Sequence, residues 1–289
     1  MDERDFEILM ALKETGNITR AADRLYITQS SLSKKIQAIE KELDICLLIR
    51  SRQGVHFTPE GEIVVKRTSE AACLLDIMRN ELNTKKGTIC GTLNAGISIN
   101  YALYKLPDIL AQYRQKYPLV TTHISSDQSR NLYLQVTKGQ IDLAIIRGEY
   151  DWKGEKILLS REKICAIRSK KDDNRSLHTL PYIERKTDLQ FERELAQWMR
   201  EQSIQPKNNG ISVDNITTCV EMVQRGLGWS IVPEICLKNF DGIVEPLVFE
   251  NGEPFVRSTY LMYNSNVAEL PQVKAFIEML KNHKEAFHV

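Results

Sequence analysis

Two neighbouring helical segments constrain the fold of this chain more than any other feature. Residues 17–25 place alanines and a leucine on one face, and residues 28–36 repeat leucine and isoleucine at helical spacing. Small residues let two helices cross closely, so the pattern predicts a helix-turn-helix corner. Thr28 precedes the second helix, and its hydroxyl can accept unpaired amide protons of the first turn.

The outward face of the second helix carries groups that a DNA major groove can pair with. Amides and hydroxyls can hydrogen-bond base edges, and lysines can approach phosphates. The alternative is a helical hairpin buried in a larger core, because two-helix corners are common. The DNA-binding candidates on this helix are Thr28, Gln29, Ser30, Ser31, Ser33, Lys34 and Lys35.

A wing is predicted directly after this corner. Residues 47–59 have the pattern of two brief strands around a glycine-containing turn. Arg50 and Arg52 lie in this segment and could reach phosphates or a narrow minor groove, where negative potential attracts guanidinium groups. The wing favours DNA binding over the buried hairpin.

These motifs resemble the LysR-type family of bacterial transcriptional regulators, over essentially the whole chain. The resemblance rests on the runs Ala-Ala-x-x-Leu, Thr-Gln-Ser-Ser-Leu-Ser-Lys-Lys-Ile and Arg-Ser-Arg-x-Gly-Val-x-Phe-Thr-Pro-x-Gly. Asp44 departs from it, because the family usually has glycine at that helix exit, and Leu48-Ile49 replace a common aromatic-acidic pair. Asp44 can still adopt a left-handed cap, so we expect the same fold.

The composition is that of an ordinary folded protein, and the chain as a whole has almost no excess of positive charge. The 289 residues include 39 lysines and arginines against 38 acidic residues, so any DNA-binding charge must be local. No apolar run is long enough to cross a bilayer, and no N-terminal signal sequence is recognised, so we expect a cytoplasmic protein without a membrane partner.

The six cysteines are scattered, without a Cys-x-x-Cys pair or metal-ligand spacing. Reduced, buried thiols are therefore the simplest expectation. Some members of the resembling family sense oxidants through a cysteine pair in the ligand domain. Cys165, Cys219 and Cys236 leave that alternative open.

A long amphipathic helix is predicted from the wing to about Thr84, with one stripe formed by Ile63, Val64, Ala71, Leu74, Leu75, Met78 and Leu82. A small winged domain cannot bury so long a stripe alone. The resemblance implies antiparallel pairing with a second copy, and hence a homodimer or homotetramer. The alternative is packing against the chain's own effector domain.

The remaining sequence alternates predicted strands and helices, which favours a mostly parallel sheet. We expect a helix over residues 101–117, a second lobe starting near Glu162, and a strand over residues 256–263 that crosses back. Leu-Pro-x-x-Leu-x-x-Tyr-x-x-x-Tyr-Pro and Gly-x-Ile-Asp-Leu-Ala-Ile resemble the family's effector domain, which is similar to periplasmic solute-binding proteins.

The fold class expected is therefore α/β, with an N-terminal winged helix-turn-helix, a long linker helix and a two-lobed effector domain like a periplasmic binding protein. The expected domains are residues 1–58 for DNA binding, 59–87 for the linker and dimerisation helix, and 88–289 for effector binding. Within the last, lobe I covers about 88–161 and 265–289, and lobe II about 162–264.

A ligand site is expected where strands end and helices begin, because unpaired amide protons collect there. A guanidinium at such a strand end can clamp a carboxylate, so the predicted ligand is a small carboxylate-bearing effector. Ser98 and Asn215 could instead be plain helix caps, and Arg147 could form an ion pair with Asp127 or Glu149. The effector-binding candidates are Ile97, Ser98, Ile99, Asn100, Ser125, Ser126, Asp127, Arg147, Asn215 and Ile231.

The sequence thus predicts a sequence-specific DNA-binding transcriptional regulator that responds to a small effector. No catalytic motif appears, so we expect neither an enzyme nor a cofactor. The five histidines are dispersed along the chain, so we also expect no metal site. The expected partners are double-stranded promoter DNA, the effector and further copies of this chain, and RNA polymerase is kept open. The alternative is a small-molecule-binding protein without regulatory DNA binding.

Overall fold

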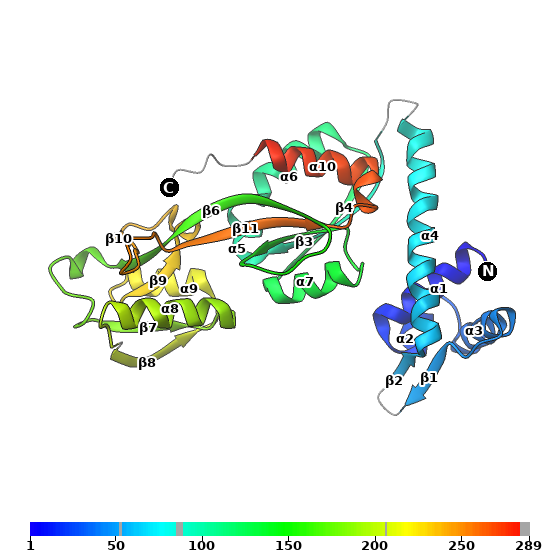
Figure 1. Ribbon diagram of the computed structural model, residues 1–289, viewed down its shortest axis with the longest axis horizontal. Helices are drawn as coiled ribbons and strands as arrows, with labels where there is room; N and C mark the ends of the chain where they lie inside the picture. Colours follow the sequence, from blue (N-terminus) through cyan, green and yellow to red (C-terminus); the bar gives the residue numbers. More distant parts are fainter. Residues whose placement is uncertain (52–53, 85–88, 206, 284–289) are drawn as a thin grey trace. The chain divides into compact units, whose positions relative to one another are not determined.

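The computed structural model describes residues 1–51, 54–84, 89–205 and 207–283. The chain divides into two compact units, Met1–Thr88 and Ile89–Val289, and each is described by itself (Figure 1). In the described part of the chain, no helix combines the length and the apolar character needed to cross a membrane.

The N-terminal unit is a winged helix-turn-helix followed by a long helix. Its strands β1 and β2 pair antiparallel, and the helices enclose an apolar core that includes Leu9, Leu32 and Ile36. The elements are α1 (Glu3–Thr15), α2 (Ile18–Arg24), α3 (Gln29–Leu43), β1 (Leu48–Ser51), β2 (Gly54–Phe57) and α4 (Pro59–Thr84).

Local capping explains the corner between α2 and α3. The Asn17 side chain accepts hydrogen bonds from the amides of Thr19 and Arg20, which starts α2. Thr28 caps α3 by accepting from the Ser31 amide, as predicted. Asp44 ends α3 in the left-handed conformation, at φ 54° and ψ 43°, so it fills the expected glycine position.

Gly61 allows α4 to start against the segment before the wing. A Cβ at this position would lie 2.3 Å from the Leu47 carbonyl oxygen and 3.2 Å from the Phe57 ring. The Thr58 hydroxyl fixes the same turn, because it donates to the Cys46 carbonyl and accepts from the Gly61 amide. Only a residue without a side chain fits there.

We therefore expect Gly61→Ala to lower the free energy of unfolding of the N-terminal unit by about 1–3 kcal/mol, because backbone must move to admit the methyl group. Thermal unfolding of the full chain measures the change. Glu62→Ala, at the exposed neighbouring position, is the matched control and should be close to neutral. Equal stability of the two variants would contradict this account of Gly61.

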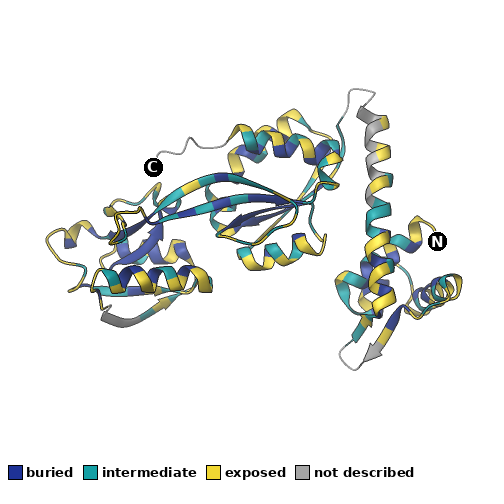
Figure 2. Cartoon of the chain, viewed as in Figure 1, coloured by how far each residue is buried: buried dark blue, intermediate teal, exposed yellow. Residues whose placement is uncertain are grey.

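The helix α4 has one buried and one exposed apolar face. Val65 packs into the core of the winged unit, whereas Ile63, Leu74, Met78 and Leu82 are each at least half exposed. Figure 2 shows exposed residues along the described length of α4. We call Ile63, Leu74, Met78 and Leu82 the linker stripe; nothing in the described part of the N-terminal unit covers it.

The second unit is two-lobed. Lobe I consists of β3–β5 with α5–α7 and α10, and lobe II of β7–β10 with α8 and α9. Figure 1 shows α6 and α10 on one side of the lobe I sheet and α7 on the other. The elements are β3 (Gly91–Ser98), α5 (Ile99–Tyr104), α6 (Leu106–Lys116), β4 (Val120–Asp127), α7 (Ser129–Thr137), β5 (Leu143–Arg147), β6 (Glu155–Arg168), β7 (Pro181–Arg185), α8 (Leu189–Glu201), β8 (Lys207–Val213), α9 (Ile216–Gln224), β9 (Ser230–Pro233), β10 (Ile243–Pro246), β11 (Val256–Tyr263) and α10 (Pro271–Asn282).

The strands β6 and β11 run through both lobes. The strand order is β10-β6-β11-β5-β3-β4, with β9 also on β6, and β7 pairs with β8 in a separate parallel pair. As expected, β3 is parallel to β4 and β5, and β11 has the predicted bounds. The pairing of β11 with β6 shifts register between Thr259 and Tyr260, which marks a β-bulge in the ladder.

One prediction about this unit was wrong in detail. The single helix expected over residues 101–117 is two helices, α5 and α6, separated at Lys105. Pro107 explains the break, because it lacks an amide proton and restricts the residue before it. Glu162, near which lobe II was expected to start, lies inside β6, which runs from Glu155 to Arg168, so no break between elements marks that position.

Candidate DNA interface and effector cavity

The exposed face of α3 begins at its first turn. Gln29, Ser30, Ser31, Lys34 and Lys35 are all exposed, and residues four apart on a helix share a face, so the serines and lysines form neighbouring rows. The Thr28 hydroxyl is engaged locally, in the cap and in a 3.0 Å contact with the Ser30 hydroxyl. This face offers an amide, hydroxyls and ammonium groups together.

Two predicted residues are placed differently from the expectation. The Ser33 hydroxyl is enclosed and makes no hydrogen bond within the described chain, because Ser33 lies at the edge of the face buried through Leu32 and Ile36. Lys35 has an acidic neighbour, with 3.9 Å between its Nζ and Oδ1 of Asp5 in α1. Lys34 is therefore the less encumbered lysine of the two.

The wing is formed as predicted, by the antiparallel strands β1 and β2. Arg50 belongs to β1, opposite Val55 in the antiparallel pair. Arg52 lies outside the described residues. Their contacts with DNA stay a prediction.

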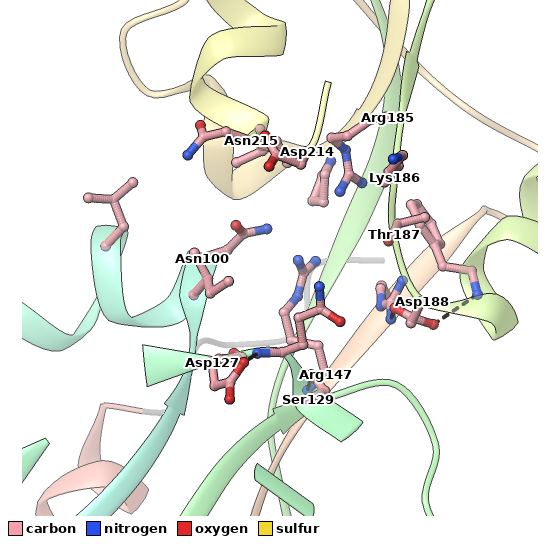
Figure 3. A pocket seen from close by; sticks show the side chains of 18 of the residues that line it. Asn100, Asp127, Ser129, Arg147, Arg185, Lys186, Thr187, Asp188, Asp214 and Asn215 are labelled. Carbon is pink, nitrogen blue, oxygen red and sulfur yellow. Dashed lines mark hydrogen bonds and ion pairs between the residues drawn. The ribbon is translucent and has the colours of Figure 1, made fainter. Parts of the chain in front are cut away.

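In the second unit, a cavity of about 170 Å³ lies between the lobes and collects strand ends and helix starts from both. Figure 3 shows Asn100, Asp127 and Ser129 on one side and Arg185, Asp214 and Asn215 on the other. Six predicted residues line it: Ser98, Ile99, Asn100, Asp127, Arg147 and Asn215. The other lining residues are Leu103, Gln128, Ser129, Arg185, Lys186, Thr187, Asp188, Phe191, Asp214, Ile216, Thr217, Pro233 and Arg257.

Four predicted residues do not line the cavity. Ile97 and Ile231 are buried in the strands β3 and β9, where their side chains pack in the core. Ser125 and Ser126 are exposed on β4, and only the last residue of that strand, Asp127, reaches the cavity. The predicted residues at strand ends and helix starts therefore line the cavity, and those within the strands do not.

The segment 185–188 and Arg257 also line the cavity and were not predicted from the sequence. Arg185 ends β7, and Asp188 caps α8 by accepting from the Phe191 amide. This is the same strand-end position that drew attention to Arg147 on β5. The rule about strand ends could have found it, because Arg185 lies between the strand β7 and the helix α8.

Arg147 forms an ion pair at the floor of the cavity, but with a partner that we did not predict. Its Nη2 lies 2.6 Å from Oε1 of Glu162, and the two side chains are only 9% and 10% exposed. Asp127 instead accepts from the Gln128 amide, and Glu149 accepts from Lys156. Burial raises the pKa of Glu162, and Arg147 opposes that shift.

Arg257 and Arg185 both lie over the ring of Phe191. The guanidinium carbons are 4.5 Å and 5.9 Å from the ring centroid, within the range of cation–π contacts. Arg257 also forms an ion pair with Asp188. Burial lowers the pKa of both guanidinium groups from the ordinary value, although arginine stays protonated in proteins.

The two candidate caps behave differently. Asn215 is a true cap, because its Oδ1 accepts from the amides of Thr217 and Thr218. Ser98 is not, since its side chain makes no capping bond to α5 and its hydroxyl has no hydrogen-bond partner in the described chain, although the residue is only 3% exposed. Capping therefore accounts for Asn215 and not for Ser98.

The three buried cysteines of this unit, Cys165, Cys219 and Cys236, have raised thiol pKa values. Burial raises the pKa of the Cys165 and Cys236 thiols to about 12, and it raises that of Cys219, whose sulfur lies 3.1 Å from the Ser230 hydroxyl. Thiols rather than thiolates are present at neutral pH, and thiolate is the reactive form.

Known protein families match both the helix-turn-helix segment and the two-lobed unit. A family described as the bacterial regulatory helix-turn-helix protein, lysR family, matches residues 4–62, and the LysR substrate binding domain matches residues 86–285. The HTH-type transcriptional regulator YraN of Bacillus subtilis (strain 168) is 33% identical over 285 residues, which cover 98% of this chain and 99% of YraN.

Solved structures have the same fold over nearly the full length. A full-length OxyR variant from Pseudomonas aeruginosa is 18% identical with a TM-score of 0.71, covering 97% of this chain and 95% of that one. Full-length CbnR complexed with its target DNA is 18% identical with a TM-score of 0.59, covering 98% of this chain and 100% of CbnR.

Proposed function

This chain belongs to the LysR family of helix-turn-helix transcriptional regulators, and we propose that a small carboxylate-bearing effector in the cavity between its lobes controls its binding to promoter DNA. It is a DNA-binding regulator with an effector-binding domain, and the family is not enzymatic. The observation that carries the proposal is the cavity itself, which joins polar strand ends of both lobes around the buried guanidinium groups of Arg147 and Arg257.

The proposed working form is an oligomer in the cytoplasm, where promoter DNA is available. The exposed linker stripe supports pairing of α4 between two copies, because an apolar stripe of this length needs a partner surface. An effector that binds one arrangement of the lobes more tightly shifts the population toward it. Through the paired helices, that shift would change the spacing of two α3 helices on DNA.

A gel-shift titration tests the function directly. The promoter fragment upstream of the chain's own gene is compared with a shuffled fragment of equal length and base composition, at moderate salt. We expect clear preference for the promoter, and a small organic acid that raises the melting temperature should alter this binding. Equal affinity for both fragments would overturn the proposal.

Substitutions on α3 should distinguish a residue that reads a base from a residue that contacts a phosphate. Gln29→Ala is expected to lose about 1–3 kcal/mol of discrimination at one base position while affinity for shuffled DNA stays the same. Lys34→Ala should weaken binding to all sequences alike and reduce the slope of log affinity against log salt by about 1. Competition gel shifts at several salt concentrations measure both. A Gln29 variant that loses affinity equally for every sequence would show that Gln29 reads no base.

A further inference from the structure

The cavity holds one partly buried cation without a carboxylate partner. Arg147 is paired with Glu162, and Arg257 with Asp188. Arg185 makes no ion pair within the described part of the chain. Its Nε is enclosed without a hydrogen-bond partner, as are the Nε atoms of Arg147 and Arg257, so the missing ion pair is what distinguishes Arg185. This group of three arginines and two carboxylates thus carries one uncompensated positive charge.

The exposed rim does not cancel that charge at Arg185. Lys186 and Asp214 are both exposed at the mouth of the cavity, where water screens them. Asp127 accepts hydrogen bonds from Gln128 and Asn131 on its own lobe. An unpaired charge that is partly removed from water is costly, so Arg185 is suited to an anionic occupant.

Two apolar side chains of α5 also line the cavity, among polar residues of lobe I. Ile99 and Leu103 on α5 line it from lobe I and are 48% and 52% exposed. They lie one helical turn apart, so they form one small hydrophobic surface. The cavity therefore offers a cation without an ion pair, Arg185, in lobe II and a small hydrocarbon surface, Ile99 and Leu103, in lobe I.

The volume limits the size of the occupant. A volume of about 170 Å³ is close to that of an engineered cavity of about 150 Å³ that binds benzene. A compact organic acid therefore fits this cavity. Such an acid would cover both the cation and the apolar surface at once.

Building on the proposed function, we propose that the effector is an amphipathic organic acid whose carboxylate pairs with Arg185 in lobe II and whose hydrocarbon part rests on Ile99 and Leu103 in lobe I. Arg185 then sets the charge preference of the site. Arg147, already neutralised by Glu162, holds the floor in place. The ligand contacts both lobes and so can stabilise one arrangement of them.

The test uses three probes on the full chain: hexanoate, the uncharged isostere hexanamide, and acetate, which lacks the longer hydrocarbon part. Affinity is measured by thermal-shift titration at constant ionic strength. We expect hexanoate to bind more tightly than either of the other probes. Arg185→Gln should weaken hexanoate roughly 10- to 100-fold, the range of a lost charged hydrogen bond, and abolish its advantage over hexanamide. Leu103→Ser should abolish its advantage over acetate.

Arg193→Gln is the matched control, because Arg193 is an exposed arginine on α8 outside the cavity, and it should leave hexanoate binding unchanged. The unliganded Arg185→Gln protein should melt no lower than wild type, since it loses an unpaired, partly buried charge. Hexanoate bound equally by wild type and Arg185→Gln, hexanamide bound as tightly as hexanoate, or no binding of hexanoate to wild type would each overturn the inference. Promoter preference in the gel shift is measured on the same samples, so failure here with intact preference leaves the DNA-binding function standing.

Discussion

Replacing Arg147 with methionine is expected to lower the free energy of unfolding of the effector unit by about 3–5 kcal/mol, because Glu162 is left buried without its cation. The partners are 2.6 Å apart, and their side chains are only 9% and 10% exposed, so water cannot replace the lost guanidinium. The remaining hydrogen bond to Glu162, from the Ile235 amide at 3.3 Å, is too little to hold a carboxylate there. Chemical denaturation of the full chain measures the loss.

The double variant Arg147→Met with Glu162→Met is the control for this prediction. Methionine fills a similar volume without charge, and replacing both members of a buried ion pair is often neutral. We expect the double variant to recover most of the stability. If Arg147→Met alone unfolds with wild-type stability, the ion pair does not hold the cavity floor.

The loss should also depend on pH. Burial already raises the pKa of Glu162 and Arg147 opposes it, so removing Arg147 raises this pKa further. An acid whose pKa is raised in the folded state binds its proton more tightly there. The free energy of unfolding therefore falls as the pH rises from the pKa of the unfolded state to the pKa of the folded state. The stability gap between Arg147→Met and wild type should therefore be smaller at pH 5 than at pH 8. A gap that widens toward acid pH would contradict the assignment to Glu162.

The second large effect is expected on the linker stripe. Substituting aspartate at both Leu74 and Met78 places two charges on a surface that is apolar and at least half exposed. If α4 pairs between copies, these charges must be buried in the pair, and the dimer should dissociate. Loss of the second DNA contact then lowers promoter affinity by about 100-fold or more, the usual scale of linked binding. Sedimentation and gel shifts measure the two consequences.

A conservative exchange provides the control. Leu74→Met with Met78→Leu keeps volume and apolar character, so both the oligomer and the affinity should be retained. The stability of the N-terminal unit should be unaffected in both cases, because neither residue belongs to its core. A dimer that survives both aspartates would show that the stripe is not the pairing surface.

The sequence was most informative where structure is local. The caps Asn17 and Thr28, the buried alanines of α2 and the left-handed Asp44 are each set by neighbouring residues, so the winged helix-turn-helix could be predicted closely. Ser33 shows the limit of this reasoning. Helical spacing places it at the edge of the buried face, and only the packed structure decides on which side its hydroxyl lies.

The cavity was predictable only in part, because its walls come from distant segments. Ser98 and Arg147 follow from the rule about strand ends, and Arg185 obeys the same rule on a strand outside the main sheet. The partner of Arg147 could not be foreseen, since Glu162 was placed at a lobe boundary rather than inside the long strand β6. Arg147 on β5 and Glu162 on β6 form their ion pair although β11 lies between these strands, and sequence spacing does not reveal such a contact.

The bulge between Thr259 and Tyr260 lies in the ladder of β6 and β11, the two strands that connect the lobes. Both strands are continuous, so the lobes are joined by hydrogen-bonded sheet. Arg147 lies opposite Thr259 in the ladder, which puts the cavity floor beside that bulge. We expect a bound acid to rotate one lobe slightly relative to the other. Because the ligand lies close to the strands that join the lobes, a small rotation there displaces the far ends of the lobes by a larger distance.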